Sequence, residues 1–286
     1  MTFRDPQPQA SHRHRRGGAE PTVSVVIPAK NEALNLPHVF AALPKDLYEV
    51  ILVDGNSTDD TIAVASKLRP DITIIGQTRK GKGNALACGF AAASGDFIVM
   101  LDADGSTDPA EIPRFVEALR QGADFAKGSR FMAGGGSSDI SHFRQMGNFF
   151  LNKVVNLIYG TRYTDLCYGY NAFRRECLSV MNLDAGDVAG VDGDTMLWGD
   201  GFEVETLINV RIAKAGLQVA EVPSFERSRY HGTSNLNAFS DGIRVLRTIE
   251  TERRRGSRKA TVASASSARE VGESWAQLST LVEKAS

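Results

Sequence analysis

The sequence predicts a single α/β domain with a mostly parallel sheet that helices flank on both sides. The first observation is a series of aliphatic and β-branched runs, such as residues 22–29 and 48–55, that would be buried on both faces. The second is that segments with apolar residues at helical spacing separate these runs. Strands and helices that alternate in this way typically form a parallel sheet covered on both faces.

The order of the elements follows from the same patterns, because turn residues such as Gly, Pro, Asn and Asp bound each apolar run. The predicted strands cover residues 22–29, 48–55, 71–76, 95–104, 123–130 and 217–223. The predicted helices cover residues 31–43, 58–68, 83–93, 109–120, 142–160 and 202–215.

The two ends of the chain differ in composition from this domain, which we place at residues 21–250. Residues 1–20 are polar and aperiodic, which predicts a disordered leader. Residues 251–270 are basic and rich in Ser and Ala, as is typical of a linker. Residues 271–286 carry an apolar stripe, which predicts a short amphipathic helix that docks on the domain or on a partner.

Composition and charge narrow the class of protein. The 286 residues are 42% hydrophobic, and the net charge of −1 gives no overall positive field that would attract nucleic acid. The three cysteines have no CxxC spacing, which argues against a disulfide framework or a zinc site and favours a reducing, cytoplasmic location. No stretch reaches the roughly 18 apolar residues of a membrane-spanning helix, so we expect any lipid substrate to be met at a membrane surface.

Carboxylates follow the predicted strand 95–104, where parallel α/β sheets bind their ligands. In an extended backbone Asp102 and Asp104 project to the same side. Two such carboxylates repel each other unless a cation such as Mg²⁺ or Mn²⁺ neutralises them. The alternative is a turn at Asp104 with Asp108 as the cap of the next helix. We favour the metal for the pair and the cap for Asp108.

Further charged residues stand at other strand ends. Asp54 closes the run 48–55, and Lys82 lies between two glycines ahead of a predicted helix, as in a phosphate-binding loop but without P-loop spacing. Arg130 closes the strand 123–130, where its guanidinium either holds a pyrophosphate or is simply solvated.

Six stretches, taken in order, resemble the motifs of family 2 glycosyltransferases, and in particular the dolichol- and polyprenyl-phosphate mannosyl- and glucosyltransferases. The resemblance covers about residues 22–250, and the order of several motifs is more specific than any one of them. The stretches are VVIPAKNE, VDGNSTDDT, LDADGSTDP, GSR, TDLCYGYNAFRRE and RYHGTSNL.

This resemblance implies a GT-A (Rossmann-like) catalytic domain that binds a GDP- or UDP-hexose with Mg²⁺ or Mn²⁺ and transfers the sugar with inversion. It assigns Asp102 and Asp104 to the metal and the donor diphosphate, and it assigns phosphate contacts to Arg130, Arg229 and Ser234. It places four residues in the nucleoside pocket: Pro28, Asn31, Glu32 and Asp54.

The chain departs from the usual family pattern at three positions. Gly55 stands where a second acid often follows the first, which leaves the base and the choice between GDP and UDP open. Ser106 stands in place of a usual Gln, and Asn235 in place of a usual Lys. These two departures leave the sugar donor and the acceptor open.

Sugar transfer leaves negative charge on the nucleoside diphosphate, so cationic groups must stabilise it. A metal ion, helped by Arg130 and Arg229, would do so. A phosphate acceptor is already an anion, whereas an alcohol acceptor needs a general base. In that second case Asp200 or Glu203 can serve, or the two residues simply form the start of the helix 202–215.

Three hypotheses follow. The first is metal-dependent, inverting transfer of mannose or glucose from a nucleotide sugar to a polyprenyl phosphate. The second keeps this chemistry with a soluble alcohol or a phosphorylated small molecule as acceptor, and the third is a non-catalytic nucleotide-sugar-binding protein. Peripheral contact with the inner face of the membrane would suit the first. Residues 239–259, with their basic end, can provide that contact, although we slightly favour a helix packed on the domain and followed by a solvated linker.

Overall fold

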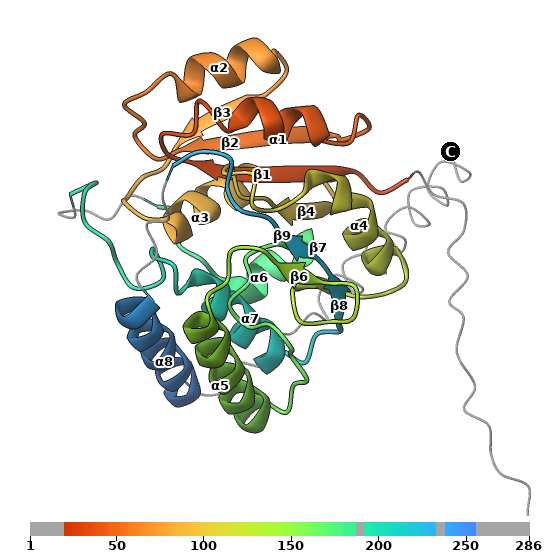
Figure 1. The fold of residues 1–286 in the computed structure, drawn as a ribbon, viewed down its shortest axis with the longest axis vertical. Coiled ribbons are helices and arrows are strands. Elements are labelled where there is room, and N and C mark those ends of the chain that lie inside the picture. Colours follow the sequence, from red (N-terminus) through yellow and green to blue (C-terminus); the bar gives the residue numbers. More distant parts are fainter. Residues whose placement is uncertain (1–19, 187–191, 233–237, 256–286) are drawn as a thin grey trace, which may run out of the picture.

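The centre of the molecule is a seven-stranded sheet with the order β3-β2-β1-β4-β7-β5-β8. The computed structural model describes residues 20–186, 192–232 and 238–255, and Figure 1 shows helices on both sides of the sheet. The strands of this sheet are β1 (Val23–Ala29), β2 (Glu49–Asp54), β3 (Thr73–Gly76), β4 (Phe97–Met100), β5 (Phe125–Ser129), β7 (Asn171–Arg174) and β8 (Val219–Pro223).

The predicted mostly parallel sheet is confirmed, since six of its seven strands run in the same direction. The exception is β7, which pairs antiparallel with both β4 and β5. We did not predict β7, because its four residues, NAFR, are too short to show a period. Its place between β4 and β5 leaves those two strands parallel to each other, so the carboxyl ends of β1, β2, β4 and β5 share one edge.

Alternate residues of the strands enter two separate cores. Val25 and Ile27 of β1 pack with α1 (Leu36–Ala42) and α4 (Ile112–Arg120) on one face. Val26, between them, packs with α3 (Lys82–Ala92) and α7 (Val204–Lys214) on the other. Burial on both faces explains why the strands are apolar at successive positions.

Two of the differences between predicted and observed bounds bear on the site. The helix predicted from residue 31 begins at Leu36, because Asn31 adopts a positive φ of 58° and its side chain binds the backbone of Thr58 instead. The strand predicted to residue 104 ends at Met100, so both acids of the Asp-x-Asp pair lie in the loop that follows.

The remaining elements are helices and short segments in the second half and at the connections. They are α2 (Thr61–Leu68), η1 (Pro109–Glu111), β6 (Gly136–Ser137), α5 (His142–Tyr159), η2 (Arg175–Cys177), α6 (Leu178–Met181), β9 (Phe225–Glu226) and α8 (Ala238–Arg254).

A third core joins α5, α7 and α8, and Figure 1 shows α5 and α8 together at the lower end of the molecule. Val245 and Ile249 of α8 are buried in it, so the helix packs on the domain as one alternative predicted. The boundary that we placed at residue 250 falls inside α8. The rest of the predicted linker and the predicted helix 271–286 lie outside the described residues, as does the predicted leader apart from Glu20. No helix of the described residues combines the length and the apolar composition needed to cross a membrane.

Candidate functional site

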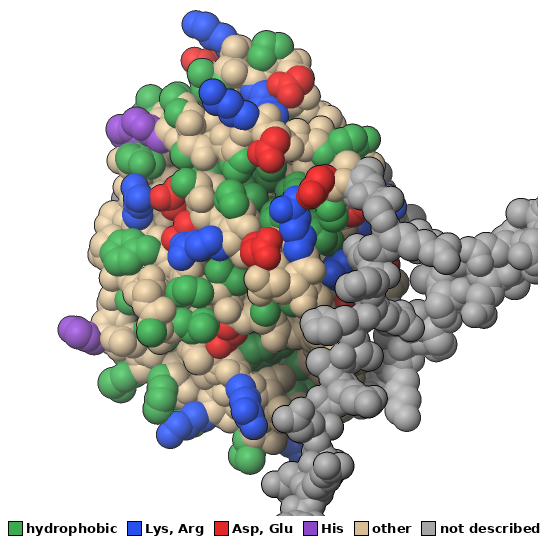
Figure 2. Space-filling view, turned by 90° about the vertical axis from the view of Figure 1, so that its right-hand side faces the viewer, with side chains coloured by type: hydrophobic (Ala, Val, Ile, Leu, Met, Phe, Trp, Pro, Cys, Tyr) green, Lys and Arg blue, Asp and Glu red, His purple; other side chains and the backbone are tan. Residues whose placement is uncertain are grey.

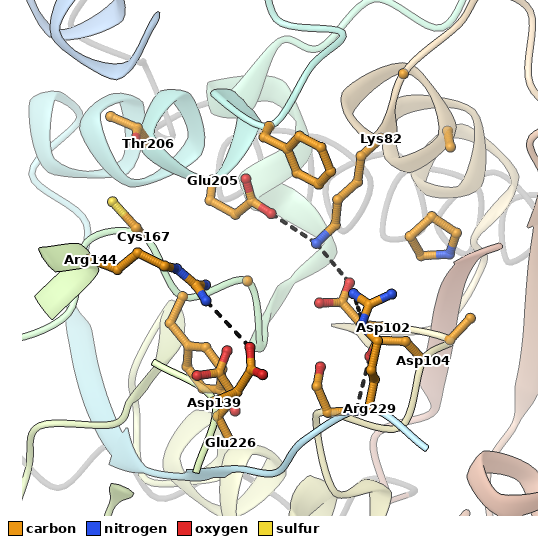
Figure 3. A pocket seen from close by; sticks show the side chains of 18 of the residues that line it. Lys82, Asp102, Asp104, Asp139, Arg144, Cys167, Glu205, Thr206, Glu226 and Arg229 are labelled. Atoms are coloured by element: carbon orange, nitrogen blue, oxygen red, sulfur yellow. Dashed lines mark hydrogen bonds and ion pairs between the residues drawn. The ribbon is translucent and has the colours of Figure 1, made fainter. Parts of the chain in front are cut away.

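A pocket of about 630 Å³ opens at the edge of the sheet where β1, β4 and β5 end. Figure 3 shows its acids and bases on two sides, with Lys82, Asp102 and Arg229 on one side and Arg144 and Glu226 on the other. Among the residues proposed from the sequence, those that line the pocket are Pro28, Glu32, Lys82, Asp102, Asp104, Arg130 and Arg229.

Each acid of the Asp-x-Asp pair has its own cationic partner. Asp102 lies 2.7 Å from the ammonium nitrogen Nζ of Lys82, and Asp104 lies 2.9 Å from a guanidinium nitrogen of Arg229. A second carboxylate, that of Glu205, lies 2.9 Å from the same Nζ of Lys82. The repulsion that the sequence predicted between the acids is therefore offset by two cations that come from distant parts of the chain.

A tight loop holds Asp104 in place. Gly105 has a φ of 78°, and a Cβ atom at this position would lie 2.4 Å from the ring of Tyr230. The backbone amide of Tyr230 donates to the carbonyl of Asp104 at 3.3 Å, and the amide of Ser106 donates to its carboxylate at 2.9 Å. The segment that carries Arg229 and Tyr230 therefore packs directly on the loop that begins at Asp104.

Asp108 takes the other role that we favoured for it. Its carboxylate accepts a hydrogen bond from the amide of Ala110 at 3.0 Å and caps η1. It also pairs with Arg227 at 2.7 Å, and it is not among the pocket-lining residues. The cap is thus confirmed, and Asp108 is separated from the Asp-x-Asp pair.

Lys82 and Glu205 are brought together by two helix starts. Lys82 is the first residue of α3, and Glu205 lies in the first turn of α7. Burial raises the pKa of the Glu205 carboxyl above its usual value, while the Lys82 charge opposes this shift. Burial also disfavours the charged form of Lys82, but the carboxylates of Asp102 and Glu205 outweigh it and raise its pKa. Lys82 is therefore a cation at neutral pH.

Arg130 lies in the pocket wall, but its guanidinium already binds protein carboxylates. It contacts Asp165 at 2.7 and 2.9 Å and Glu226 at 3.0 Å, and its pKa is raised because these acids outweigh its burial. This differs from the solvated or phosphate-facing arginine that we expected. In the described state Arg130 ties the end of β5 to residue 165 and to β9, and its contact with substrate stays a prediction.

The residues predicted for the nucleoside divide into two groups. Pro28 and Glu32 line the pocket, whereas Asn31 and Asp54 do not. Asn31 instead links the loops after β1 and β2, and Asp54 accepts from the amide of Ser57 at 3.1 Å. The other oxygen of Asp54, Oδ1, is buried without a hydrogen-bond partner among the described residues, so this carboxylate keeps an unused acceptor beside the pocket.

Gly55, where the family often has an acid, lines the pocket in this chain. A Cβ atom here would lie 3.2 Å from Cβ of Lys30 and 3.4 Å from Oε1 of Gln77. The carbonyl oxygen of Ala29 would lie at 3.3 Å, so a larger residue at this position would crowd Lys30 and the end of β1.

The two acids predicted to act as a base do not line the pocket. The carboxylate of Asp200 is buried and bound by Arg79 at 2.9 and 3.0 Å. That of Glu203 accepts from the amides of Gly199 and Gly201 at 3.0 and 3.4 Å. Neither carboxylate caps α7, since both bind groups outside the helix, and Glu205 is the acid of this segment that lines the pocket.

Sequence reasoning missed Glu205, Arg144 and Asn148, which all line the pocket. Every residue from 203 to 210 is buried, so periodicity could not distinguish a pocket-facing position in α7. The spacing of Arg144 and Asn148, four residues apart on α5, places both on one face of the helix and was an available signal. Ser234 and Asn235 lie outside the described residues.

The donor atoms fit a divalent cation that a substrate helps to bind. Asp102 and Asp104 supply two carboxylates at the pocket, and Mg²⁺ typically takes one or two carboxylates plus substrate phosphates. Within residues 20–186, 192–232 and 238–255, no group of three or more His, Cys, Asp or Glu residues forms an all-protein cage. The arrangement therefore suits a metal that arrives with a diphosphate.

Fold and site together define an α/β protein whose pocket combines two paired acids with the cationic side chains of Lys82 and Arg229. The family model for glycosyl transferase family 2 matches residues 24–181, and the chain belongs to this family. An undecaprenyl-phosphate mannosyltransferase of Micrococcus luteus is 31% identical over 233 residues, which cover 78% of this chain and 91% of that one. A polyprenol monophosphomannose synthase of Mycolicibacterium smegmatis is 32% identical over 225 residues, or 74% of this chain and 80% of the relative.

Other relatives are longer or are known as structures. A dolichol-phosphate mannosyltransferase of Pyrococcus furiosus is 31% identical over 75% of this chain, and the match spans 59% of that protein's length. Glucosyl-3-phosphoglycerate synthase of Mycobacterium tuberculosis, solved with phosphoglyceric acid, superposes with a TM-score of 0.62 at 23% identity, covering 84% of this chain and 85% of that one. The fold is accordingly the predicted GT-A fold.

Proposed function

We propose that this protein transfers a hexose, either mannose or glucose, from a GDP- or UDP-sugar to a polyprenyl phosphate, with inversion and with Mg²⁺ or Mn²⁺. Family membership and the names of the bacterial relatives support the reaction class. The observation that carries the proposal is a single pocket that joins the Asp-x-Asp pair and its cations to an apolar wall. That wall contains Ile140, Phe143, Leu151 and Val245.

The charged side of the pocket suits the donor. A metal ion held by Asp102 and Asp104 would supply positive charge that stabilises the leaving nucleoside diphosphate. Lys82 and Arg229 already lie against these carboxylates, so the diphosphate would find two cations at the edge of the metal site. Gly55 lines the same pocket without a side chain, and the contact of its neighbour Asp54 with the nucleoside stays a prediction.

The opposite side suits an acceptor that is charged at one end and apolar at the other. Arg144 lines the pocket and pairs with Asp139 at 3.3 Å, an exposed contact that a phosphate can replace. Phe143 and Leu151 of the same helix stand beside it in the pocket wall. A phosphate acceptor needs no general base, which agrees with the absence of Asp200 and Glu203 from the lining.

The outer face of α5 is apolar and continues from the pocket wall. Figure 2, which views the molecule from the right-hand side of Figure 1, shows apolar and basic side chains mixed along the lower edge. Lys153 lies 4.5 Å from the ring of Phe149 on this helix. The exposed fractions of its apolar residues are 64% for Phe143, 70% for Met146, 60% for Phe149, 58% for Phe150 and 87% for Leu157.

On this basis we propose that the protein lies at the inner face of the membrane. A helix surface that is apolar and flanked by basic residues, like that of α5, binds anionic lipid through apolar insertion and basic contacts. The membrane contact that we predicted at residues 239–259 moves to α5, because α8 uses Val245 and Ile249 for packing. Flotation with vesicles of anionic phospholipid tests this placement. A Phe149→Ser/Phe150→Ser variant should lose binding, whereas Leu68→Ser, an exposed change in α2, should not.

A transfer assay tests the proposed reaction. Purified protein, Mn²⁺ and undecaprenyl phosphate in detergent are combined with labelled GDP-mannose or UDP-glucose, and we expect label in the organic phase. EDTA should abolish it. Label that enters only water-soluble product, with phosphoglyceric acid or an alcohol as acceptor, would favour the second candidate. A soluble phosphorylated acceptor is the chemistry for which the structurally similar synthase is named. Donor binding without any transfer would indicate a non-catalytic protein.

A further inference from the structure

We propose that Glu205 is a positioning residue that keeps Lys82 in the pocket when a divalent cation takes the place of Lys82 on Asp102. The inference rests on the proposed function, because it assumes that the Asp-x-Asp pair binds metal with a nucleoside diphosphate. It adds Glu205, which the sequence did not indicate, to the site. It also implies that the ion pair between Lys82 and Asp102 breaks when the metal binds.

The first support is the geometry of a shared cation. Nζ of Lys82 lies 2.7 Å from Asp102 and 2.9 Å from Glu205, and Figure 3 shows it between the two carboxylates. An ammonium group has three donors. It can therefore leave one carboxylate for a phosphate oxygen while it stays bound to the other.

The second support is that the two carboxylates differ in exposure. The side chain of Asp102 is 28% exposed and that of Glu205 is 8% exposed. A ligand that enters the pocket thus reaches Asp102 more easily. If Lys82 left Glu205 as well, a buried carboxylate would remain without its cation, which is strongly unfavourable. The exchange is consequently favoured at Asp102 and disfavoured at Glu205.

The third support is a set of glycines that make the arrangement possible. Cβ atoms at Gly81 and Gly83 would lie 2.1 and 1.9 Å from the carbonyl oxygens of Asp200 and Gly199, so α3 can approach the segment before α7 only with glycine on both sides of Lys82. The amide of Gly83 donates to the carbonyl of Asp200 at 2.7 Å. This close approach is what brings Lys82 within reach of α7.

Gly169 completes the space around the shared cation. A Cβ atom there would lie 3.1 Å from Oε1 of Glu205 and 3.2 Å from Nζ of Lys82. Gly169 therefore lies against both members of the pair at the pocket wall, and a side chain there would crowd them. The charges of the site predict how Lys82 responds when the metal binds. Lys82 neutralises Asp102 while the pocket holds no metal, and it becomes available to the diphosphate when the metal is present.

Direct binding of Mn²⁺, followed by the electron paramagnetic resonance of the free ion, tests the proposal without turnover. Titrations are made with and without UDP or GDP. We expect Glu205→Gln to weaken Mn²⁺ binding about five- to tenfold in both conditions, because Lys82 then depends on Asp102. Lys82→Gln should bind Mn²⁺ more tightly without nucleotide, since its competitor is gone, and more weakly with nucleotide, since the diphosphate has lost a cation.

The double variant separates positioning from a simple loss of charge. If Glu205 acts through Lys82, the Glu205→Gln change should alter Mn²⁺ affinity less than twofold in the Lys82→Gln background. An equal loss in both backgrounds would mean that Glu205 contributes only its charge and would overturn the proposal. Glu117→Gln is the control: this carboxylate lies on α4, is exposed and does not line the pocket, so the Mn²⁺ affinity should stay within twofold of wild type.

Two outcomes distinguish this inference from the proposed function beneath it. If the wild-type protein binds Mn²⁺ and Asp104→Ala does not, but Glu205→Gln matches the wild type, only the role of Glu205 is wrong. If the wild-type protein binds no Mn²⁺ with either nucleotide, or Asp104→Ala binds it equally well, the metal site and the proposal that rests on it are both wrong. Partial recovery of affinity by Glu205→Asp would further support a carboxylate that holds Lys82.

Discussion

Two ion pairs that begin three residues apart differ in what surrounds them. Arg79 pairs with Asp200 and Lys82 pairs with Glu205, so each links the start of α3 to the start of α7. The side chains of Arg79 and Asp200 are 2% and 5% exposed, and the guanidinium is further bound by the carbonyls of residues 184 and 186. Lys82 instead lines the pocket and shares a third partner, Asp102.

The comparison shows how neighbouring charges in one short motif acquire different roles. The Arg79 pair is closed, because its donors and acceptors are satisfied within the protein. The Lys82 pair is open, because one of its carboxylates faces the pocket where a ligand can compete. We call these the closed pair and the open pair.

The largest expected effect lies in the closed pair. Asp200→Asn leaves the buried charge of Arg79 without its carboxylate, which should lower the free energy of unfolding by about 3–5 kcal/mol. Denaturant unfolding measures this change. Asp184→Asn is the control, since its carboxylate lies 3.7 Å from the same guanidinium but is 64% exposed, and it should cost less than about 1 kcal/mol. Equal losses for the two variants would show that the pair is not closed.

The next effect concerns the acid beside the open pair. Asp104→Ala should abolish metal-stimulated transfer, a loss of at least about 10²–10³-fold. It should change the free energy of unfolding by about 1 kcal/mol or less, because the contact of Asp104 with Arg229 is partly exposed. Initial rates with and without Mn²⁺ measure it. Asp108→Ala, an acid of the same loop that caps η1, should lower stability by about 1 kcal/mol and retain the metal response. Full metal-dependent activity of the Asp104→Ala protein would contradict the site.

A smaller effect is expected from filling the space around the open pair. Gly169→Ala should push the flexible ends of Lys82 and Glu205 aside by a few tenths of an ångström and raise the Mn²⁺ concentration needed for half-maximal activity by about two- to fivefold, or less than 1.4 kcal/mol. Gly76→Ala, where an added Cβ meets nothing within 4 Å, is the control. An unchanged Mn²⁺ dependence would show that the space is not needed.

The smallest effect concerns Glu32. Burial raises its pKa above the usual 4.5, and the nearby charges of Asp104 and Asp102 add to this, although a hydrogen bond from Asn35 opposes it. Because the pKa of Glu32 is higher in the folded than in the unfolded protein, its charged form lowers the free energy of unfolding at a pH above the folded pKa. This loss disappears as the pH falls below the pKa of the unfolded protein. Glu32→Gln should therefore be more stable than the wild type at pH 7. Denaturant unfolding measured between pH 7 and pH 4 should show that the stability difference between the variant and the wild type shrinks as the pH falls. A difference that grows would contradict the assignment.

Much of the fold and part of the site were predictable from local patterns. Buried strands are apolar at successive positions and helices have their own period, so the order of strands and helices, the mostly parallel sheet and the Asp-x-Asp pair at a strand end could all be inferred. The cap at Asp108 was likewise predictable, because capping depends on the next two or three residues alone. The short strand β7 was not, because four residues show no period and its pairing depends on partners more than 40 residues away.

The sequence by itself therefore determined the architecture, the family and the place of the acids, since each of these depends on neighbouring residues or on the order of motifs. Only the tertiary structure decided which charges meet. It paired Lys82 with Glu205 rather than with Asp200, buried Arg130 against Asp165, and turned the apolar face of α5 outward. The ion pairs that join Lys82, Arg130 and Arg229 to their carboxylates span 20 to 125 residues of the chain, and no local period records such distances. For Lys82 and Glu205, the close packing of α3 against the segment before α7 through glycines brings the two side chains together.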